Sequence, residues 1–211
     1  MVFPAELVVL AAGGLGTPLI LKRSGVPCES RLFVDPVLCV AAPWPRSMQR
    51  REVRMPFVFQ RPGYLVSPYF DCVSFLFNRG WRHPAGRLPG LMIKPADSEQ
   101  GKVCAKRGRL DKALGDRDRQ RLAEAETLGR QILVEFGVGP ASIVTGTLNA
   151  GHAGGMLPLT ATDARTLRPG RLPQNLYVAD ASLFPHSLGN PPILAVLALA
   201  RRMARAAVAA L

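Results

Sequence analysis

The stretch that decides the fold reads NLYVADASLFP and occupies residues 175–185. Residues 176–179 form a short continuous apolar run, which predicts a buried strand of a parallel sheet. Asp180 follows this run directly, and Ala181 comes next. Ligands of α/β sheets bind outside the carboxyl ends of the strands. Asp180 is therefore a candidate site residue; the alternative is a turn aspartate that caps a neighbouring backbone amide.

On the carboxyl-terminal side of this stretch, the sequence GNPP at residues 189–192 opens a long apolar segment. We expect a helix over residues 191–210, because proline is tolerated in the first turn of a helix. Asn190 stands where this helix begins, and asparagine is a favoured N-cap residue. Its amide is also suited to hydrogen-bonding a substrate oxygen, so both roles stay open.

On the amino-terminal side, His152 lies on a glycine-rich loop that reads LNAGHAGGM at residues 148–156. Imidazole titrates near neutral pH and is the side chain most often used as a general base. The flanking glycines allow the backbone to pass close to a ring system. The alternative is a surface or capping histidine on a turn. We expect His83 and His186 to be exposed loop residues, and the three histidines lack the spacing of metal ligands.

The start of the chain has the pattern of half a βαβ unit. Residues 7–12 form an apolar run, and the sequence GGLGTPLIL follows at residues 13–21. This pattern predicts a buried strand, a tight turn and a helix. Gly14 and Gly16 lack the third glycine of a dinucleotide-binding fingerprint. Because the chain begins almost on this strand, and a parallel strand needs neighbours, we expect a fragment of a larger fold.

The middle of the chain gives weaker patterns. Residues 28–45 are rich in proline and are expected to be irregular, and residues 79–101 are expected to form loops. Residues 117–136 form the clearest amphipathic helix, and Gly137 suits a left-handed cap after it. Two alternating runs between residues 52 and 78 predict antiparallel strands. Their better-buried positions are Val53, Met55, Phe57 and Phe59 in the first run and Val73, Phe75 and Phe77 in the second.

Two segments resemble the glucose-methanol-choline family of flavin oxidoreductases. Residues 13–26, with a Thr-Pro turn, an aliphatic helix and a Ser-Gly pair, resemble the second signature of that family, which usually has Pro, Ser, Thr or Ala at the position of Gly14. Residues 152–200 resemble its carboxyl-terminal part, above all in VADAS and in the Asn-Pro pair that opens the last helix. Residues 108–139 are similar to the helical return between its two domains, whereas residues 30–100 match poorly.

The resemblance implies a mixed α/β (α+β) fold, with part of an FAD-binding Rossmann-like sheet and part of a substrate domain built on an antiparallel sheet. Residues 1–30 would be a strand–turn–helix piece of the FAD-binding domain, and residues 31–140 would resemble the substrate domain. Residues 141–211 would be the carboxyl-terminal part of the FAD-binding domain, with the catalytic loop. The chain lacks the amino-terminal dinucleotide-binding motif, so it is expected to be a carboxyl-terminal portion.

The same resemblance implies roles for single residues. His152 matches the catalytic base, and Asn190 matches the second active-site position, where the family carries His or Asn. Asp180 and Ala181 would lie beside the ribityl and pyrophosphate part of FAD. The last helix would point its positive end at the flavin pyrimidine. The cofactor-binding positions at the start of that helix are Asn190, Pro191 and Pro192.

The implied activity is an FAD-dependent oxidation of CH–OH groups, in which hydride passes to flavin N5 and a histidine takes the hydroxyl proton. The implied partners are a small-molecule alcohol and, unless the chain is truncated, a separate chain that supplies the amino-terminal half of the FAD-binding domain. We therefore expect the isolated chain to bind flavin poorly. The alternatives are a non-catalytic remnant or binding module of the same fold and, less favoured, a basic nucleic-acid-binding protein.

Composition narrows these classes. With 48% hydrophobic and 20% charged residues the chain is able to build a core. The 27 Lys and Arg residues exceed the 15 Asp and Glu residues, giving a net charge of +12. The densest basic stretch, residues 102–121, is interrupted by aspartates and lacks aromatic residues, so we expect no nucleic-acid partner.

Sequence features also bear on localisation and metals. The four cysteines are far apart and form no C-x-x-C pair, which indicates reduced thiols in a cytoplasmic protein and no metal site. The amino terminus lacks the basic region of a signal peptide. The apolar segment at residues 191–200 is too short to span a bilayer, which takes about 20 residues.

Overall fold

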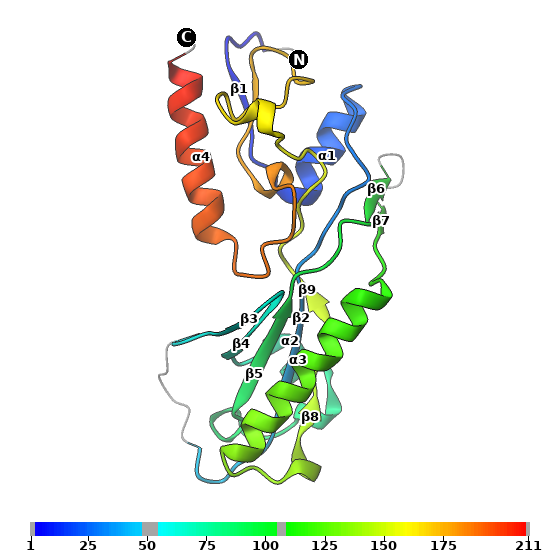
Figure 1. Cartoon of the computed structure of the whole chain (residues 1–211), viewed down its shortest axis with the longest axis vertical. Helices are drawn as coiled ribbons and strands as arrows, with labels where there is room; N and C mark the ends of the chain where they lie inside the picture. The colour runs from blue at the N-terminus through cyan, green and yellow to red at the C-terminus, as the bar shows by residue number, and fades with distance from the viewer. Residues whose placement is uncertain (1–2, 48–54, 105–108, 210–211) are drawn as a thin grey trace. The chain divides into compact units, whose positions relative to one another are not determined.

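The computed structural model describes residues 3–47, 55–104 and 109–209. It divides the chain into two compact units, each built from segments that are separate in the sequence (Figure 1). Unit 1 consists of Met1–Val34, Ser98–Ala113 and His152–Leu211, and unit 2 consists of Asp35–Asp97 and Leu114–Gly151. The middle segment of the sequence analysis, residues 31–140, thus contributes to both units. The assignment of the segments to cofactor and substrate domains stays a prediction.

The centre of unit 1 is a parallel pair of short strands, β1 (Val8–Leu10) and β10 (Leu176–Val178). Helix α1 (Gly13–Arg23) follows β1 after a tight turn, and α4 (Ile193–Val208) is the last helix of the unit. The predicted strand–turn–helix, the strand over residues 176–179 and the last helix are thereby confirmed. The other elements are the antiparallel strands β6 (Lys102–Cys104) and β7 (Arg109–Asp111) and the 3₁₀ helices η4 (Ala161–Asp163) and η5 (Ala181–Leu183).

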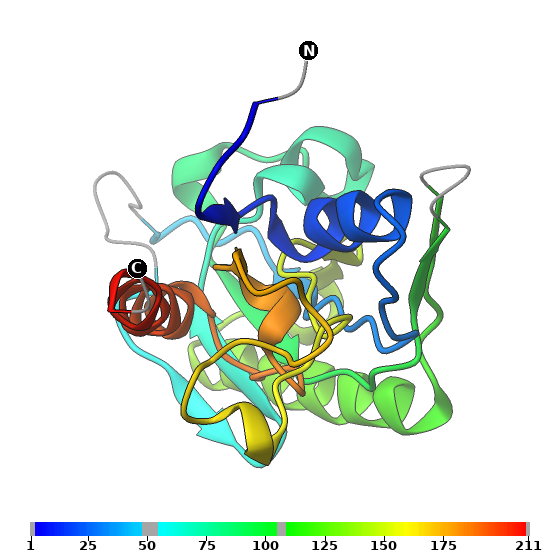
Figure 2. The ribbon, with the colours of Figure 1, turned by 90° about the horizontal axis from the view of Figure 1, so that it is seen from above.

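The two faces of the parallel pair are covered by different helices. On one face Leu10 and Val178 pack with Leu21 of α1. On the other face Tyr177 packs with Met203 of α4. Figure 2 shows α1 and α4 on opposite sides of the two strands.

The prediction that the first strand is buried is wrong. Val8 and Val9 of β1 are 38% and 46% exposed. In the described part of the chain β1 has a neighbour, β10, on one edge alone. The cluster around α4 contains Tyr177 and Leu7 but not Val9. This apolar run therefore lies at the border of the core, whereas its sequence predicts a position inside the core.

Unit 2 is built on an antiparallel sheet with the strand order β3-β4-β5-β2-β8, and β9 also pairs with β2. Helix α3 packs on one face, where Ala125 and Leu133 join Val40 and Ile93. The other face carries a second cluster around Trp81. The bounds are β2 Pro36–Ala41, β3 Phe59–Arg61, β4 Tyr64–Pro68, β5 Gly90–Pro95, β8 Val144–Thr145, β9 Asn149–Ala150, α2 Cys72–Phe77, α3 Asp116–Glu135, η1 Arg79–Trp81, η2 Ala85–Arg87 and η3 Pro140–Ser142.

With its parallel pair in unit 1 and its antiparallel sheet in unit 2, the protein has the mixed α/β fold that the sequence predicts. The two central strands of unit 2 were nevertheless missed. The irregular segment predicted at residues 28–45 contains β2, and the loops predicted at residues 79–101 contain β5; both strands are buried along their whole length. A strand covered on both faces shows no alternation of apolar and polar residues, which removes the usual signal.

The second alternating run of the sequence analysis forms helix α2, so its assignment as a strand is wrong. Asp71 caps this helix, because its side chain accepts hydrogen bonds from the amides of Val73 and Ser74 at 3.1 and 3.2 Å. An N-cap aspartate of this kind favours a helical turn over an extended chain. In the first run, Phe59 opens β3, while Val53 lies outside the described residues.

The amphipathic helix predicted over residues 117–136 is confirmed as α3. It begins after Gly115, and the aspartates of its first turn, Asp116 and Asp118, complement the positive end of the helix dipole. Gly137 follows with a φ of +101°, the left-handed conformation expected of a glycine cap.

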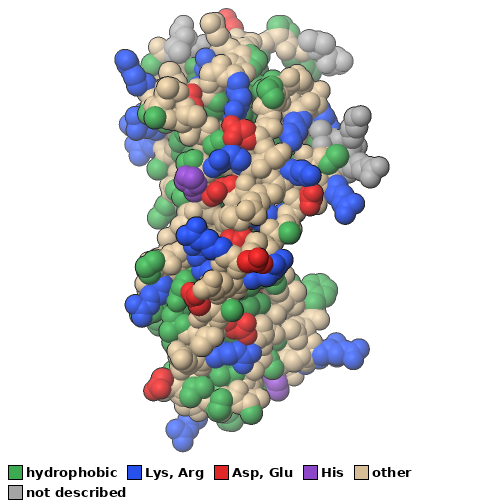
Figure 3. All heavy atoms as spheres, turned by 45° about the vertical axis from the view of Figure 1, so that its right-hand side comes forward, with side chains coloured by type: hydrophobic (Ala, Val, Ile, Leu, Met, Phe, Trp, Pro, Cys, Tyr) green, Lys and Arg blue, Asp and Glu red, His purple; other side chains and the backbone are tan. Residues whose placement is uncertain are grey.

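The surface matches the dispersed charge of the sequence. On the face drawn in Figure 3, Lys and Arg side chains are scattered, with Asp and Glu among them. Across residues 3–47, 55–104 and 109–209, no helix has the length and apolarity that a membrane crossing requires.

Unit 2 contains a buried ion pair at the ends of its central strands. Lys94 of β5 and Asp35, which precedes β2, are both 1% exposed at the side chain, and Lys94 Nζ lies 2.7 Å from Asp35 Oδ2. Burial lowers the pKa of Lys94, while the Asp35 carboxylate opposes this shift. The amide of Asp35 also donates to Asp97 Oδ1 at 2.9 Å. Asp35 has a φ of +51°, so the contacts hold it in a conformation that asparagine and aspartate tolerate best.

Replacing Asp35 by Asn tests how much this ion pair contributes to the stability of unit 2. Asp35→Asn keeps the shape and the tolerance for positive φ but leaves the Lys94 ammonium buried without its partner. We expect unit 2 to lose about 3 kcal/mol of unfolding free energy. Both tryptophans, Trp44 and Trp81, lie in unit 2, so urea unfolding followed by tryptophan fluorescence reports on this unit.

The control for this experiment is Arg119→Gln, which breaks an exposed ion pair with Asp116 in the same unit. It is expected to change the unfolding free energy by less than about 1 kcal/mol. Equal losses of unfolding free energy in Asp35→Asn and Arg119→Gln would show that the buried ion pair matters no more than the exposed one.

Candidate functional site

The candidate site lies in unit 1, at the carboxyl edge of the β1–β10 pair. After β10 the chain reaches Asp180, which is 6% exposed. Its Oδ2 accepts hydrogen bonds from the amide of Gly13 at 3.0 Å and from Thr17 Oγ1 at 2.5 Å, both in α1. Its Oδ1 accepts from the amide of Ser182 in η5 at 2.9 Å. Asp180 thus links the start of α1, which follows β1, to the start of η5, which follows β10.

These contacts decide what the first turn of α1 is able to bind. A helix N-terminus attracts anions through its free amides and its dipole. Here the carboxylate of Asp180 already occupies that position at Gly13. The glycines at positions 14 and 16 therefore do not form a phosphate-binding loop, in agreement with the missing third glycine. Asp180 acts as the turn aspartate of the sequence analysis, and its place beside FAD stays a prediction.

The loop that carries His152 packs directly against the same helix. A Cβ built on Gly14 of α1 would lie 1.9 Å from the carbonyl oxygen of Ala153. Gly14 is therefore required by the close approach of the helix and the loop. Further along, a Cβ on Gly154 would lie 2.4 Å from the carbonyl oxygen of Ala181. The loop is thus held between the start of α1 and the start of η5.

Backbone hydrogen bonds fix this loop on both sides. The amide of Gly154 donates to Phe33 O at 3.1 Å, and the amide of Gly155 donates to Ala181 O at 3.2 Å. The amide of His152 itself donates to Val34 O at 3.4 Å. The His152 side chain is half-buried. The structure therefore brings the predicted base onto a rigid loop that touches Ala181, one of the predicted cofactor-binding residues.

Asn190 lies on the turn before α4, and its side chain is exposed. Its Nδ2 donates to Leu188 O at 3.4 Å, within the same turn. The N-cap of α4 is Pro192, two residues further on, so the predicted capping role of Asn190 is wrong. The helix starts late because a residue that precedes a proline is disfavoured in the helical conformation, and Asn190 and Pro191 both precede a proline. The convergence of Asn190 and His152 stays a prediction.

The start of α4 is open to an anionic group. No side chain caps it, and its first turn contains no acidic residue. Pro192 is buried and fixes the turn, while Ile193 and Leu194 are exposed. The free amides and the positive dipole end of this 16-residue helix suit a partly negative ring such as a flavin pyrimidine. This part of the chain fits the isoalloxazine end of FAD, whereas the start of α1 does not fit its pyrophosphate.

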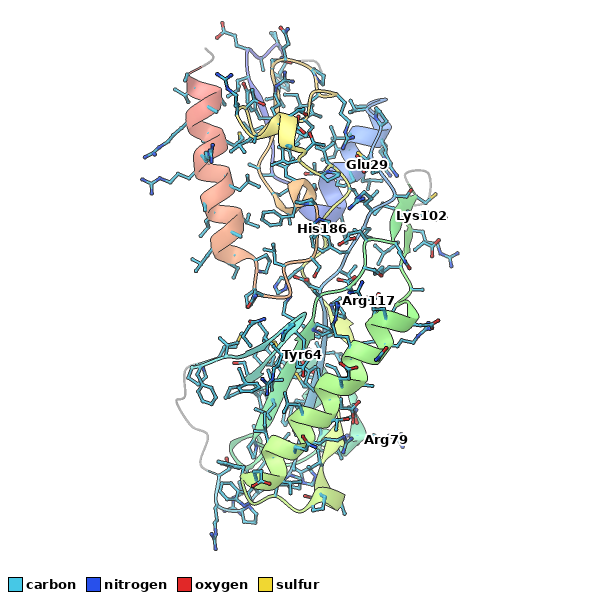
Figure 4. All side chains as sticks on the ribbon, viewed as in Figure 1. Glu29, Tyr64, Arg79, Lys102, Arg117 and His186 are labelled. Atoms are coloured by element: carbon cyan, nitrogen blue, oxygen red, sulfur yellow. The ribbon has the colours of Figure 1, made fainter. Side chains whose placement is uncertain are left out.

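The predicted exposed position of His186 is confirmed. His186 is exposed, and its Nδ1 lies 3.2 Å from Glu99 Oε1 (Figure 4). Within the part of the chain that the structure describes, no cluster of His, Cys, Asp or Glu could hold a metal ion. Sequence reasoning missed Thr17 and Gly14 as positioning residues. The Thr-Pro pair marked the segment, but nothing in the sequence shows that a residue 163 positions later accepts a hydrogen bond from the threonine hydroxyl.

Replacing Thr17 by Val tests the contact with Asp180. The substitution keeps the side-chain shape but removes the hydroxyl that donates to the buried carboxylate and accepts from the amide of Ala12, which should lower the unfolding free energy by about 1 to 3 kcal/mol. Calorimetric unfolding measures the loss for unit 1, which contains no tryptophan. Thr162→Val removes a hydroxyl that is exposed in the same unit and should have little effect. If Thr17→Val lowers the unfolding free energy no more than Thr162→Val does, the hydrogen bond between Thr17 and Asp180 does not stabilise unit 1.

Replacing Gly14 by Ala tests the packing of the loop. The added methyl group would overlap Ala153 O, so the loop backbone has to move, and its amides should exchange faster with deuterium. Mass spectrometry of the peptide over residues 151–157 measures this. At Gly170 a Cβ meets no atom within 4 Å, so Gly170→Ala is the matched control and should leave exchange unchanged. Unchanged exchange in Gly14→Ala would show that the loop does not depend on this contact.

The comparisons with known proteins agree with this architecture. No family model matches the sequence. An uncharacterized protein of Methanocaldococcus jannaschii is 27% identical over 207 residues, which cover 95% of this chain and 53% of that protein. The crystal structure of a pyridoxine 4-oxidase from Mesorbium loti superposes with a TM-score of 0.67 at 22% identity, over 94% of this chain and 50% of the oxidase. The chain therefore shares the fold of this oxidase and spans about half the length of both relatives.

Proposed function

We propose that the chain is part of an FAD-dependent oxidoreductase that acts on CH–OH groups of donors, and that it carries the catalytic base. The observation that supports this most directly is the rigid His152 loop, fixed at the carboxyl edge of the parallel pair within a fold that a pyridoxine 4-oxidase shares. The resemblance of the sequence to the glucose-methanol-choline family of flavin oxidoreductases points to the same kind of activity.

The proposed chemistry divides between the cofactor and the chain. A bound FAD would accept a hydride from the alcohol carbon, and the hydroxyl proton must leave the substrate with it. His152 is the proposed acceptor of this proton, because an imidazole is able to take a proton near neutral pH. Asn190 is the proposed donor of a hydrogen bond to the substrate oxygen, which would orient the alcohol.

The chain would hold only one end of the cofactor. The open start of α4, with Asn190, Pro191 and Pro192, is the proposed contact of the flavin ring. Asp180 and Ala181 are the proposed neighbours of the ribityl and pyrophosphate part of the cofactor, and Ala181 touches the His152 loop. The first turn of α1 is already occupied by Asp180, so the adenosine and pyrophosphate of FAD require another segment. We propose that this segment lies outside the given sequence, either in a further part of the same protein or in a separate polypeptide.

One observation favours a second candidate function, a non-catalytic binding module of the same fold. Each hydrogen bond of Asp180 described above goes to its own chain, and these bonds would hold unit 1 together with or without a cofactor. A protein that had lost catalysis would still need them.

The experiment that separates the two functions starts from tagged chain purified from its native host together with any bound polypeptide. An oxidase part should bring flavin absorbance bands that an alcohol bleaches under anaerobic conditions, tested on a panel that includes pyridoxine. The isolated chain, stripped of partners, should bind added FAD poorly. A native preparation without flavin, in which added FAD is not reduced by any alcohol, would overturn the enzyme proposal in favour of the binding module.

The base is tested in the same flavin-containing preparation. His152→Ala should slow flavin reduction by roughly 10²–10⁴-fold, the range expected for loss of a general base. His186→Ala is the matched control, since His186 is exposed and pairs with Glu99. The control should reduce flavin at the original rate. Equal rates for the original protein and His152→Ala would refute the assignment of the base.

A further inference from the structure

The loop that carries the proposed base runs beside residues 29–34, a second segment of unit 1. We refer to residues 29–34 as the supporting segment. The amide of Phe33 donates to Gly154 O at 3.1 Å, and Phe33 O accepts from the amide of Gly154. Further along the loop, the amide of Glu29 donates to Met156 O at 2.9 Å. The supporting segment and the loop are thus paired in antiparallel direction.

The ring of Phe33 lies directly against the loop. Phe33 is 2% exposed. A Cβ built on Gly154 would lie 2.5 Å from Cζ of this ring, and a Cβ built on Gly155 would lie 2.8 Å from its Cδ1. Two carbon atoms in ordinary contact are about 3.5–4.0 Å apart. The ring therefore occupies the space that a side chain at either glycine would need.

The neighbours of Phe33 hold the loop through other contacts. Successive side chains of an extended segment point to opposite faces. Leu32 and Val34 pack with the buried Met156, and the partly buried Ala153 joins this cluster. The loop residues that follow the proposed base are thus packed against the supporting segment by their side chains as well as by their backbone.

The position of the imidazole depends on this support. A general base must lie within hydrogen-bond reach of the proton that it takes, and a displacement of about 1 Å is able to slow a reaction roughly 100-fold. The amide of His152 donates to Val34 O at 3.4 Å, which is longer than the usual range of about 2.7 to 3.2 Å. This bond alone holds His152 weakly. The contacts of the ring with Gly154 and Gly155, two and three residues further on, are much closer.

We propose that Phe33 is a positioning residue for the proposed base. Its ring supports the loop backbone at Gly154 and Gly155 and thereby sets the place of the His152 imidazole. Phe33 acts through His152 and touches neither the alcohol nor the flavin. The inference rests on the proposed function for the role of His152, whereas the support of the loop rests on the packing alone.

The first test measures the loop and needs no cofactor. Phe33→Leu removes the ring beneath the two glycines, so the amides of the peptide over residues 151–157 should exchange with deuterium about tenfold faster. Met203→Ala is the control, because Met203 is also 2% exposed in unit 1 but packs with Tyr177 and Ala207. It should leave the exchange of this peptide unchanged. Unchanged exchange in Phe33→Leu would overturn the proposal.

The second test measures the reaction in the flavin-containing preparation. In Phe33→Leu the limiting rate of flavin reduction should fall about 10- to 100-fold, because the imidazole is displaced. The flavin content and the alcohol concentration that gives half the limiting rate should stay the same, since Phe33 touches neither molecule. Met203→Ala should reduce flavin at the original rate. A higher half-saturating concentration with an unchanged limiting rate would contradict the positioning role.

The third test combines Phe33→Leu with His152→Ala. Without the imidazole there is no base to displace, so the double variant should reduce flavin as slowly as His152→Ala alone. If the two losses multiply, Phe33 acts independently of His152 and the proposal is wrong. Circular dichroism checks that each variant is folded. If Phe33→Leu does not fold, Phe33→Met, which changes the side-chain volume less, takes its place in all three tests.

Failure of this inference differs from failure of the proposed function. If Phe33 has no positioning role, His152→Ala still slows flavin reduction but Phe33→Leu does not. If His152 is not the base, His152→Ala reduces flavin at the original rate, and the role of Phe33 in catalysis falls with it. Faster exchange in Phe33→Leu would then remain as evidence that the ring holds the loop.

Discussion

The structure of unit 1 depends on the hydrogen bonds that the buried carboxylate of Asp180 accepts. This carboxylate accepts hydrogen bonds from the first turn of α1 and from the start of η5, and these two segments border the loop that carries His152. One short side chain at the end of a strand therefore decides where α1 leaves the sheet and where the loop lies. The three hydrogen-bond donors offset the free-energy cost of burying this carboxylate. Loss of any one donor should therefore disturb the position of the His152 loop.

Two buried carboxylates, Asp180 and Asp35, are stabilised in different ways. In unit 1 neutral donors surround Asp180, whereas in unit 2 the ammonium of Lys94 meets Asp35 directly. An ion pair of this kind contributes little net stability compared with apolar side chains of the same size, but it fixes one arrangement. The pair holds the end of β5 against the start of β2, the two strands at the centre of the sheet. In each unit a buried polar contact thus fixes the relative position of two elements.

The sequence predicted those elements whose signal is local. The strand before Asp180, the helix with its Gly137 cap and the strand–turn–helix at the start all appear in the structure. It failed for β2 and β5, because strands covered on both faces do not alternate and because Lys94 looks like a surface residue until Asp35 is known to face it. It failed for α2, where the alternation of apolar residues hid the cap at Asp71. At the candidate site the sequence pattern located the loop that carries His152, but no local pattern reveals the close approach of Gly14 to Ala153. The placement of Asn190 relative to His152 depends on long-range packing, which local patterns do not encode.

The division of unit 1 along the chain has a consequence for synthesis. The contact between Gly13 and Asp180 spans 167 residues, so β1 and α1 leave the ribosome long before the strand that completes their pair. Unit 2 lies between them in the chain, and its sheet is able to close first. Until β10 is synthesised, the apolar segment Val8–Leu10 lacks the strand with which it pairs in the described structure, at a stage when exposed strand edges promote aggregation. Release of the chain before β10 is made would therefore leave a folded unit 2 joined to apolar segments of unit 1 that are uncovered, a species prone to aggregate.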